Sequence, residues 1–549
     1  MRHFLTSLVL VSGVAAPLAA QTSLEARVDE VFRQYAANDA PGCTVGVAQN
    51  GRVLLERAYG MADLERNVPL TPASILEPGS VSKQFTAAAV LLLARDGKLS
   101  LDDRVRRWIP ELGEMGQAIT VRDLLHHTSG LRDWGSIAGI AGWPRNTRAL
   151  DHRHVLQIVG RMRELNFPPG TEYEYSNTNF NLLAIVAERA SGELLPAFTR
   201  RRIFEPLGMT STSWRDDAMR IVRGRALSYD KDANGWHSER AIENIYGNCC
   251  LLTTVGDLLK WNAAFDSTRL AGPGFRAEQE QRGVLTNGRQ IDYAAGLFEG
   301  TWRGQPWVGH TGATSGYRAD LVRYTNAGVS VAVLCNRGDA DPGSMADSVA
   351  GALVSFSPPR TPPAPARVAV PASALADKAG LYRNLRDMDA QRLRVRNGRL
   401  ETEDSVELVP TDRAGTTFQA ARGGYRLLFN RRTDGHYDAH IVTEDNDSIP
   451  ADWVADADTS RAALAAYTGR YESPEAETTI RLAPDSSGGL AATRLSTPGG
   501  PWRLKPLYRD GFEMPSGILV FTRDAAGRID GFRFTTGRVR NLRFWRLRD

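Results

Sequence analysis

The chain has 549 residues, of which 42% are hydrophobic and 24% are charged. This length exceeds one ordinary domain, so we expect two to four domains with substantial apolar cores. The 67 Lys and Arg residues against 63 Asp and Glu residues give a formal net charge of only +4, with no dense basic block. We therefore expect no nucleic-acid partner, because no cluster of cations is available to neutralise phosphates.

Residues 1–20 have the pattern of a secretory signal peptide. Arg2 and His3 form a short basic start, residues 4–18 are an apolar run, and Ala20-Gln21 offers a cleavage point. The run is too short for a stable membrane span. We expect a periplasmic or secreted protein without a membrane anchor after cleavage.

Residues 21–357 predict one domain with a single sheet. The chain forms the first strands of this sheet, continues through helices, and returns to form its last strands. An amphipathic helix is expected over 23–38, and mostly helical patterns lie between two predicted hairpins. Asn50-Gly51 is typical of the type I′ turn of a hairpin. The predicted hairpin strands are 44–49 with 52–59, and 318–324 with 329–334.

A proline-rich segment over 358–371 predicts an extended linker, because proline continues neither a helix nor a central strand. Beyond it, short alternating strands are separated by Gly, Asp and Asn turns. A Gly-x-Tyr pattern at 380–382 returns at 469–471. We expect two all-β, barrel-like domains over 372–456 and 457–549.

Arginines alternate along the last predicted strand. They are Arg538, Arg540, Arg543, Arg546 and Arg548. Because runs of like charge generally keep a surface solvated, we expect a solvated strand face here and no ligand site.

The four cysteines are too few for a disulfide scaffold and lack the spacing of a metal site. We expect Cys43 and Cys335 to be buried small apolar groups in strands. Cys249 and Cys250 are adjacent, so either they bridge each other with strain, or one of them pairs elsewhere in an oxidising compartment. We expect no metal and no cofactor.

The sharpest local feature is Gly79-Ser80-Val81-Ser82-Lys83, which an apolar run follows. A helix that opens near Ser80 places Ser80 and Lys83 on one face and puts the serine at the positive end of the helix dipole. Lysine can take the serine proton only if its pKa falls from about 10.4 towards 7, a change of about 4 kcal/mol. Burial together with a nearby positive group can supply that change.

Two further segments carry candidate residues. Tyr175 and Asn177 precede a helical pattern and could serve as proton carrier and substrate hydrogen-bonder, although Tyr-x-Asn recurs elsewhere and also suits a surface loop. His310-Thr311-Gly312 is followed by further small residues, which let the backbone of a substrate lie close to a strand. A lone histidine at such a place is more often structural than catalytic.

Together, these elements resemble in order and spacing the serine hydrolases related to penicillin-binding proteins and class C β-lactamases. The likeness covers about residues 24–354 and includes Asp123–Leu131 written as DLLHHTSGL. It implies an α/β fold, with an antiparallel sheet flanked by helices and a helical subdomain. It also implies acyl transfer through a covalent acyl-serine, without a metal.

The resemblance implies a role for each matching residue. Ser80 corresponds to the acylated nucleophile and Lys83 to its activating partner. Tyr175 corresponds to the second proton-transfer group, and Asn177 orients the substrate.

The substrate strand follows in the same way. His310, Thr311 and Gly312 stand where many relatives have Lys-Thr-Gly, along which the substrate docks. The backbone N–H groups of Ser80 and Ala313 correspond to the oxyanion hole. Relatives meet a substrate carboxylate with that lysine, whereas a histidine can be neutral at pH 7, which argues against β-lactams or D-Ala-D-Ala termini as substrates.

A catalytic domain followed by two β-barrels is similar to the D-stereospecific aminopeptidases of this family. In those enzymes a loop of the last barrel reaches over the active site, and the corresponding hairpin here, about 513–518, is short. We expect D-aminopeptidase-like activity on a small peptide, amide or ester substrate. The alternatives are an esterase, a D,D-carboxypeptidase, a weak β-lactamase, or a wall-peptide binding protein without turnover.

Overall fold

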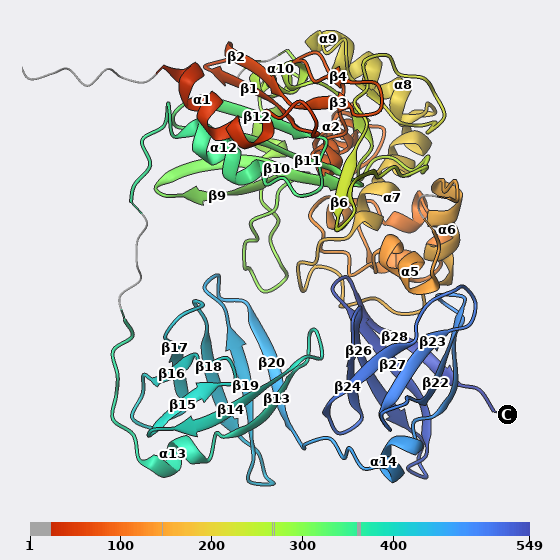
Figure 1. Cartoon of the computed structure of the whole chain (residues 1–549), viewed down its shortest axis with the longest axis vertical. Coiled ribbons are helices and arrows are strands. Elements are labelled where there is room, and N and C mark those ends of the chain that lie inside the picture. The colour runs from red at the N-terminus through yellow and green to blue at the C-terminus, as the bar shows by residue number, and fades with distance from the viewer. Residues whose placement is uncertain (1–22, 145–146, 266, 268, 359–363, 549) are drawn as a thin grey trace, which may run out of the picture.

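The structure, a computed structural model, describes residues 23–144, 147–265, 267, 269–358 and 364–548 (Figure 1). The signal peptide expected over 1–20 lies outside the described residues, as does part of the proline-rich segment expected over 358–371. Within the described part of the chain, no helix combines the length and the apolarity needed to cross a bilayer.

An antiparallel sheet of six strands, in the order β2-β1-β12-β11-β10-β9, forms the centre of the first domain. Both predicted hairpins are confirmed, since β1 pairs with β2 and β11 pairs with β12. Asn50 and Gly51 both have positive φ, 49° and 75°, as a type I′ turn requires. The strands are β1 Cys43–Gln49, β2 Arg52–Tyr59, β9 Phe298–Trp302, β10 Gln305–Thr314, β11 Tyr317–Tyr324 and β12 Val329–Cys335.

Helices cover both faces of this sheet (Figure 1). On one face, α1 (Leu24–Phe32) and α12 (Pro342–Ala350) enclose an apolar core with the strands. The predicted first helix is shorter than expected, because the chain tightens into a 3₁₀ turn over Arg33–Tyr35. On the other face lies α10 (Val255–Ala264).

A helical subdomain extends from the sheet towards the C-terminal half of the chain (Figure 1). Its centre is the pair α2 (Lys83–Arg95) and α7 (Asn177–Ser191). Residues 83–93 of α2 are buried on every side, which is typical of a helix in the middle of a large core. The other helices of this half are α3 Met115–Ala118, α4 Val121–Leu125, α5 Trp134–Ala141, α6 His152–Arg161, α8 Leu195–Thr199, α9 Glu205–Leu207 and α11 Phe275–Gln279.

Short elements complete this domain. The 3₁₀ and π turns are Gly79–Ser82, Val105–Arg107, Pro110–Leu112 and Arg200–Phe204. The two-stranded sheets pair β3 Met61–Asp63 with β4 Val68–Pro69, β5 Ser213–Trp214 with β8 Leu251–Leu252, and β6 Tyr229–Asp232 with β7 Gly235–Ser238.

Cys43 and Cys335 form a disulfide between β1 and β12. The expectation of two unbonded apolar thiols is therefore wrong, although both side chains are buried. The reason is tertiary: the two residues are 292 positions apart, and the register of β1 against β12 places them directly opposite each other.

The C-terminal half contains the two expected barrels, and each is a closed antiparallel barrel of eight strands. Each is preceded by a short helix, α13 (Ala372–Ala376) or α14 (Arg461–Ala465). The first barrel comprises β13 Gly380–Asn384, β14 Ala390–Arg396, β15 Arg399–Thr402, β16 Glu407–Pro410, β17 Thr417–Ala420, β18 Arg426–Arg431, β19 Tyr437–Val442 and β20 Ser448–Val454. The second comprises β21 Gly469–Ser473, β22 Thr478–Pro484, β23 Leu490–Arg494, β24 Trp502–Tyr508, β25 Gly511–Met514, β26 Gly517–Arg523, β27 Ile529–Thr536 and β28 Val539–Arg546.

The second barrel packs against the helical subdomain through a buried ion pair. Arg132 forms two hydrogen bonds to the Glu475 carboxylate, at 2.7 and 2.8 Å, and only 1% and 7% of the two side chains are exposed. The same guanidinium donates to the carbonyl of Arg540 on β28. This contact fixes the turn between β27 and β28 beside the first domain.

Candidate active site

Ser80 and Lys83 lie where the 3₁₀ turn Gly79–Ser82 runs into α2. Lys83 Nζ is 3.0 Å from Ser80 Oγ and donates to Asn177 Oδ1 at 2.9 Å and to the Asn248 carbonyl at 2.7 Å. The predicted proximity of Ser80 and Lys83 is thus present, and two acceptors from other parts of the chain hold the Lys83 amine beside the serine.

Complete burial lowers the pKa of the Lys83 amine well below its ordinary value. The positive charge of Arg538 lowers this pKa further, and the carboxylate of Asp133 opposes the change. Burial and a neighbouring positive charge are the two causes that the sequence analysis named for lowering the pKa of this lysine. The amine is therefore suited to accept a proton from Ser80.

Tyr175 and Asn177 approach the same point from the loop before α7. Lys83 Nζ lies 4.7 Å from the centre of the Tyr175 ring. Burial raises the pKa of the Tyr175 phenol above its ordinary value, while the nearby Ser80 hydroxyl opposes this increase. Its hydroxyl makes no well-formed hydrogen bond with any described residue. A protonated phenol beside the candidate nucleophile is suited to carry a proton.

The backbone of β10 lies directly against the turn that carries Ser80. A Cβ on Gly312 would lie 1.9 Å from the Pro78 carbonyl oxygen and 3.1 Å from Ser80 N, so only glycine fits. On the other side, Gly79 has φ +52°, and a Cβ there would lie 2.5 Å from Ala313 N. The backbone N–H groups of Ser80 and Ala313 therefore come from two segments in close contact.

His310 is buried in the middle of β10, and its ring contacts the rings of Tyr175, Tyr293 and Phe298. Its Nε2 is 3.3 Å from the Tyr293 hydroxyl, and its Nδ1 is 2.5 Å from the Thr311 carbonyl oxygen. Burial, followed by the charge of Lys83, lowers the pKa of His310 to about 3. The ring is neutral at pH 7, so it does not supply the cation that a lysine at this position would supply.

A cavity of about 580 Å³ joins these groups. Seven of the eight sequence-predicted residues line this cavity. The eighth, Lys83, is buried, with its Nζ 3.0 Å from Ser80 Oγ. The lining includes Ser80, Tyr175, Asn177, Asn248, Cys249, Phe298, His310, Thr311, Gly312, Ala313, Arg318, Asp341 and Arg538.

Arg538 corrects two expectations. It lies at the turn between β27 and β28, its guanidinium carbon is 4.9 Å from the centre of the Tyr175 ring, and it lines the cavity. The arginine series is therefore not only a solvated face. The segment of the second barrel that reaches the cavity is this turn, not the β25–β26 hairpin near 513–518, because the ion pair of Arg132 holds β28 against the first domain.

Arg540 is also not solvated. Only 7% of it is exposed, and its guanidinium pairs with Glu172 at 2.9 Å and with Glu174. Both acids lie on the loop that carries Tyr175. The second barrel thus holds the Tyr175 loop as well as lining the cavity.

Sequence reasoning missed two other residues of the site, His127 and Asn248. His127 is buried, its ring lies 4.4 Å from that of Tyr175, and its Nδ1 accepts from Asn179 Nδ2 at 3.0 Å. It belongs to the stretch Asp123–Leu131 quoted above, which was the available signal. Asn248 acts through its backbone carbonyl, which no sequence pattern marks.

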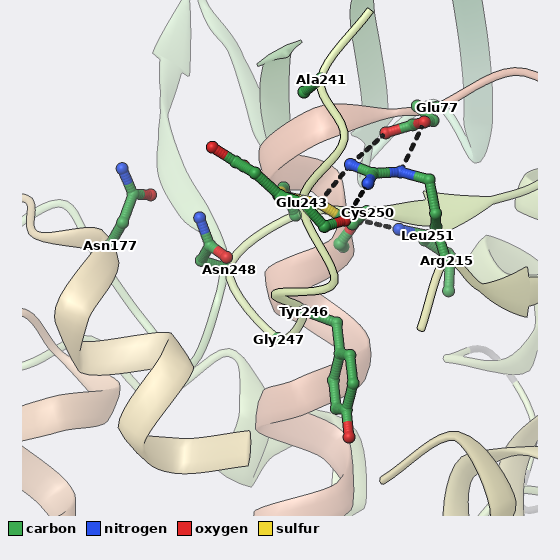
Figure 2. Close-up of a disulfide and its surroundings, with 12 residues drawn as sticks. Glu77, Asn177, Arg215, Ala241, Glu243, Tyr246, Gly247, Asn248, Cys250 and Leu251 are labelled. Atoms are coloured by element: carbon green, nitrogen blue, oxygen red, sulfur yellow. Dashed lines mark hydrogen bonds and ion pairs between the residues drawn. A yellow bond between two sulfur atoms is a disulfide. The ribbon is translucent and has the colours of Figure 1, made fainter. Parts of the chain in front are cut away.

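The Cys249–Cys250 pair, left open by the sequence, is a disulfide between adjacent residues. Figure 2 shows Arg215 extending between Glu77 and this disulfide, with Asn248 next along the chain. Leu251 N donates to Ser82 Oγ at 3.2 Å. Residues 248–251 are therefore fixed against the turn that carries the candidate nucleophile.

The fold and the serine–lysine site define a class of protein, and comparison with known families agrees. Residues 28–356 match the family model described as Beta-lactamase. This chain belongs to that family and is a serine hydrolase of it.

Among curated proteins, a D-aminopeptidase of Cereibacter sphaeroides (strain KD131) is 29% identical over 92% of this chain and 96% of its own length. A D-aminopeptidase of Brucella ovis is 27% identical over 96% of this chain and 99% of its own length. The likeness to both extends across the barrels.

Solved structures share the fold. A penicillin-binding protein homologue from Pyrococcus abyssi, described as octameric, has a TM-score of 0.54 and 21% identity, covering 78% of this chain and 99% of its own. The D-amino acid amidase from Ochrobactrum anthropi SV3 has a TM-score of 0.51 and 21% identity, covering 60% of this chain and 98% of its own.

Proposed function

We propose that this chain is an exported serine hydrolase of D-aminopeptidase type. It releases an N-terminal D-amino acid from short peptides or amides through an acyl-Ser80 intermediate. The observation that carries the proposal is the buried amine of Lys83, 3.0 Å from the Oγ atom of Ser80, which lines the cavity. The D-aminopeptidases that resemble the chain over more than nine-tenths of its length support the substrate class.

Acylation starts with proton transfer from Ser80 Oγ to Lys83 Nζ. The oxygen attacks the carbonyl carbon of the substrate, and the backbone N–H groups of Ser80 and Ala313 bind the developing oxyanion. Asn177 is held by donation from its own N–H to Asp133 Oδ2 at 2.7 Å, so its side chain can orient the substrate amide.

The leaving nitrogen needs a proton before the C–N bond breaks. Tyr175 gives that proton and regains one from Lys83, which completes the transfer from Ser80. A water molecule then attacks the acyl-serine, loses its proton to the same pair of residues and releases the D-amino acid. Ser80 recovers its hydroxyl, so protons and electrons balance over the cycle.

Export is supported by the two disulfides, Cys43–Cys335 and Cys249–Cys250, because disulfides persist in oxidising compartments. Together with the signal-peptide pattern of residues 1–20, they favour the periplasm or the exterior. Fractionation of cells that express the full chain tests this part, and recovery of the protein with an intact N-terminus in the cytoplasm would contradict it.

Hydrolysis of D-alanine p-nitroanilide tests the activity, with the L-isomer and Ser80→Ala as controls. We expect p-nitroaniline release from the D-isomer alone, and a loss of about 10³-fold or more in Ser80→Ala, because the covalent route is removed. Turnover of the L-isomer at a similar rate would overturn the D-specificity.

The alternatives remain distinguishable with chromogenic substrates. An esterase cleaves p-nitrophenyl acetate but not the anilide, and a β-lactamase opens nitrocefin. A D,D-carboxypeptidase releases the terminal D-Ala from an N-acylated D-Ala-D-Ala peptide. A binding protein without turnover would release product from none of these substrates, and Ser80→Ala would then bind ligand as the natural chain does.

A further inference from the structure

The turn between β27 and β28 is anchored rigidly at the edge of the cavity. The carbonyl oxygen of Arg538 accepts from Asp133 N at 3.1 Å and from Asn166 Nδ2 at 3.2 Å. Arg540 N donates to Asn166 Oδ1 at 2.8 Å. These bonds hold the backbone of the turn and leave the Arg538 side chain directed over Tyr175.

The Arg538 guanidinium is a cation without a partner carboxylate. It lies 4.9 Å from the Tyr175 ring and, within the described part of the chain, forms no ion pair. An arginine remains charged at every relevant pH, so the cavity presents one fixed and unneutralised positive charge beside the candidate proton carrier.

The other charged groups that line the cavity are held by hydrogen bonds within their own segments. Arg318 Nη1 donates to the Ser315 and Tyr317 carbonyl oxygens, which fix the guanidinium on its own turn without neutralising its charge. Asp341 caps α12 by accepting from Ser344 N and Ser344 Oγ. With His310 neutral, no cation on the substrate strand replaces the lysine of the relatives.

We propose that Arg538, supplied by the second barrel, binds the free α-carboxylate of the amino acid that leaves. This inference rests on the proposed function, in which Tyr175 protonates the leaving nitrogen. That nitrogen and the carboxylate are attached to the same Cα, so a group held over Tyr175 can reach the carboxylate. The preferred substrates are therefore D-aminoacyl amino acids with a free C-terminus, which are cleaved faster than the corresponding amides or anilides.

The planar guanidinium matches a carboxylate with two parallel hydrogen bonds, which makes the pair selective as well as attractive. A substrate with a neutral C-terminus leaves this cation unpaired. Because a hydrogen bond between charged groups contributes about 1.5–3 kcal/mol, we expect a preference of about 10- to 100-fold in kcat/KM for the acid.

D-Ala-D-Ala and its C-terminal amide are the matched substrates, since they differ only in that carboxylate. We expect the ratio of their kcat/KM values to favour the acid in the natural chain and to approach one in Arg538→Ala. Arg538→Lys keeps the charge without the paired geometry, so its ratio lies between. Arg533→Ala is the control, because Arg533 is on β27 and pairs with Glu164 outside the cavity.

The charge of Arg538 also lowers the pKa of Lys83, so Arg538→Ala changes the rate with every substrate. This effect is common to acid and amide and cancels in their ratio. An unchanged ratio in Arg538→Ala, with both rates reduced equally, would overturn the carboxylate role.

Binding to Ser80→Ala separates this inference from the proposed function, because it requires no turnover. We expect calorimetry to show tighter binding of D-Ala-D-Ala than of its amide, and loss of the difference in Ser80→Ala/Arg538→Ala. If the natural chain cleaves neither peptide, the proposed function fails while this binding difference still supports the Arg538 site. Equal affinity for the two peptides overturns the site even if both are cleaved.

Discussion

The ionisable side chains of the site are controlled mainly by the absence of water around them. Lys83 is completely buried, and the hydrogen-bond partners of its amine are neutral oxygens at Ser80, Asn177 and Asn248. Burial therefore makes the lysine a base, and keeps the Tyr175 phenol protonated and His310 neutral. One environment gives the three groups the protonation states that the proposed acyl transfer needs.

The depressed pKa of His310 predicts a pH-dependent stability. The ring is neutral in the folded chain down to about pH 3, whereas the unfolded chain binds a proton below its ordinary pKa of 6.5. The contribution of His310 to the free energy of unfolding is therefore complete above pH 6.5 and is lost as the pH falls towards 3. Relative to His310→Gln, the natural chain should lose more unfolding free energy between pH 7.5 and 4.5.

Urea unfolding at the two pH values measures this difference. Burial also lowers the pKa of His126 and His127, and both residues are present in the two proteins, so the comparison isolates His310 together with its own charge effect on His127. A difference between the two proteins that is the same at pH 7.5 and 4.5 would show that His310 titrates normally in the folded state.

At the scale of elements, the contact between β10 and the Ser80 turn sets the position of the two N–H groups proposed as the oxyanion hole. Gly312 permits the backbones of the two segments to approach, and the β10–β11 pairing holds the strand in register, with Gly312 opposite Ala319. Neither segment alone places two N–H groups around one oxygen. The proposed hole therefore depends on how the two segments pack.

Gly312→Ala tests this packing. Its Cβ would lie 1.9 Å from the Pro78 carbonyl oxygen, so β10 must move away from Ser80. We expect kcat/KM for the D-anilide to fall by about 100-fold, since displacement of catalytic groups by about 1 Å has effects of this size. Gly139→Ala on α5 is the control, because a Cβ there meets nothing within 4 Å. Similar rates for the two variants would contradict the argument.

At the scale of the molecule, the second barrel contributes Arg538 to the candidate active site. Arg132 and Glu475 form a buried ion pair between the helical subdomain and the barrel, and the same arginine holds Arg540. Arg540 in turn pairs with the acids of the Tyr175 loop. A deletion of the barrels would therefore remove Arg538 and release the loop, rather than only remove a separate module.

Arg132→Ala should destabilise this interface. Removal of one partner of a buried ion pair leaves Glu475 uncompensated, at a cost of about 3–5 kcal/mol. We expect faster hydrogen exchange in β28 and the 172–176 loop, together with a loss of preference for the acid peptide. Arg66→Ala, which removes an ion pair of a 69% exposed arginine, is the control. Unchanged exchange in β28 would show that other contacts hold the barrel.

The sequence by itself predicted the hairpins of the sheet, the two barrels and the serine, lysine, tyrosine and histidine segments. These features depend on local order: turn residues at Asn50-Gly51, alternation in strands, and an S-x-x-K at the start of an apolar helix. The geometry now brings Ser80, Lys83, Tyr175, Asn177 and the 310–313 strand to one cavity, while their catalytic roles stay predictions.

Only the tertiary structure decided the partners that come from distant parts of the chain. Cys335 lies opposite Cys43 through strand register, Asn248 offers a backbone carbonyl, and Arg538 arrives from a barrel more than 400 residues after Ser80. Local patterns hold no information on which surfaces meet. The burial that lowers the pKa of Lys83, and the charge of Arg538 beside it, exist only once those surfaces are packed together.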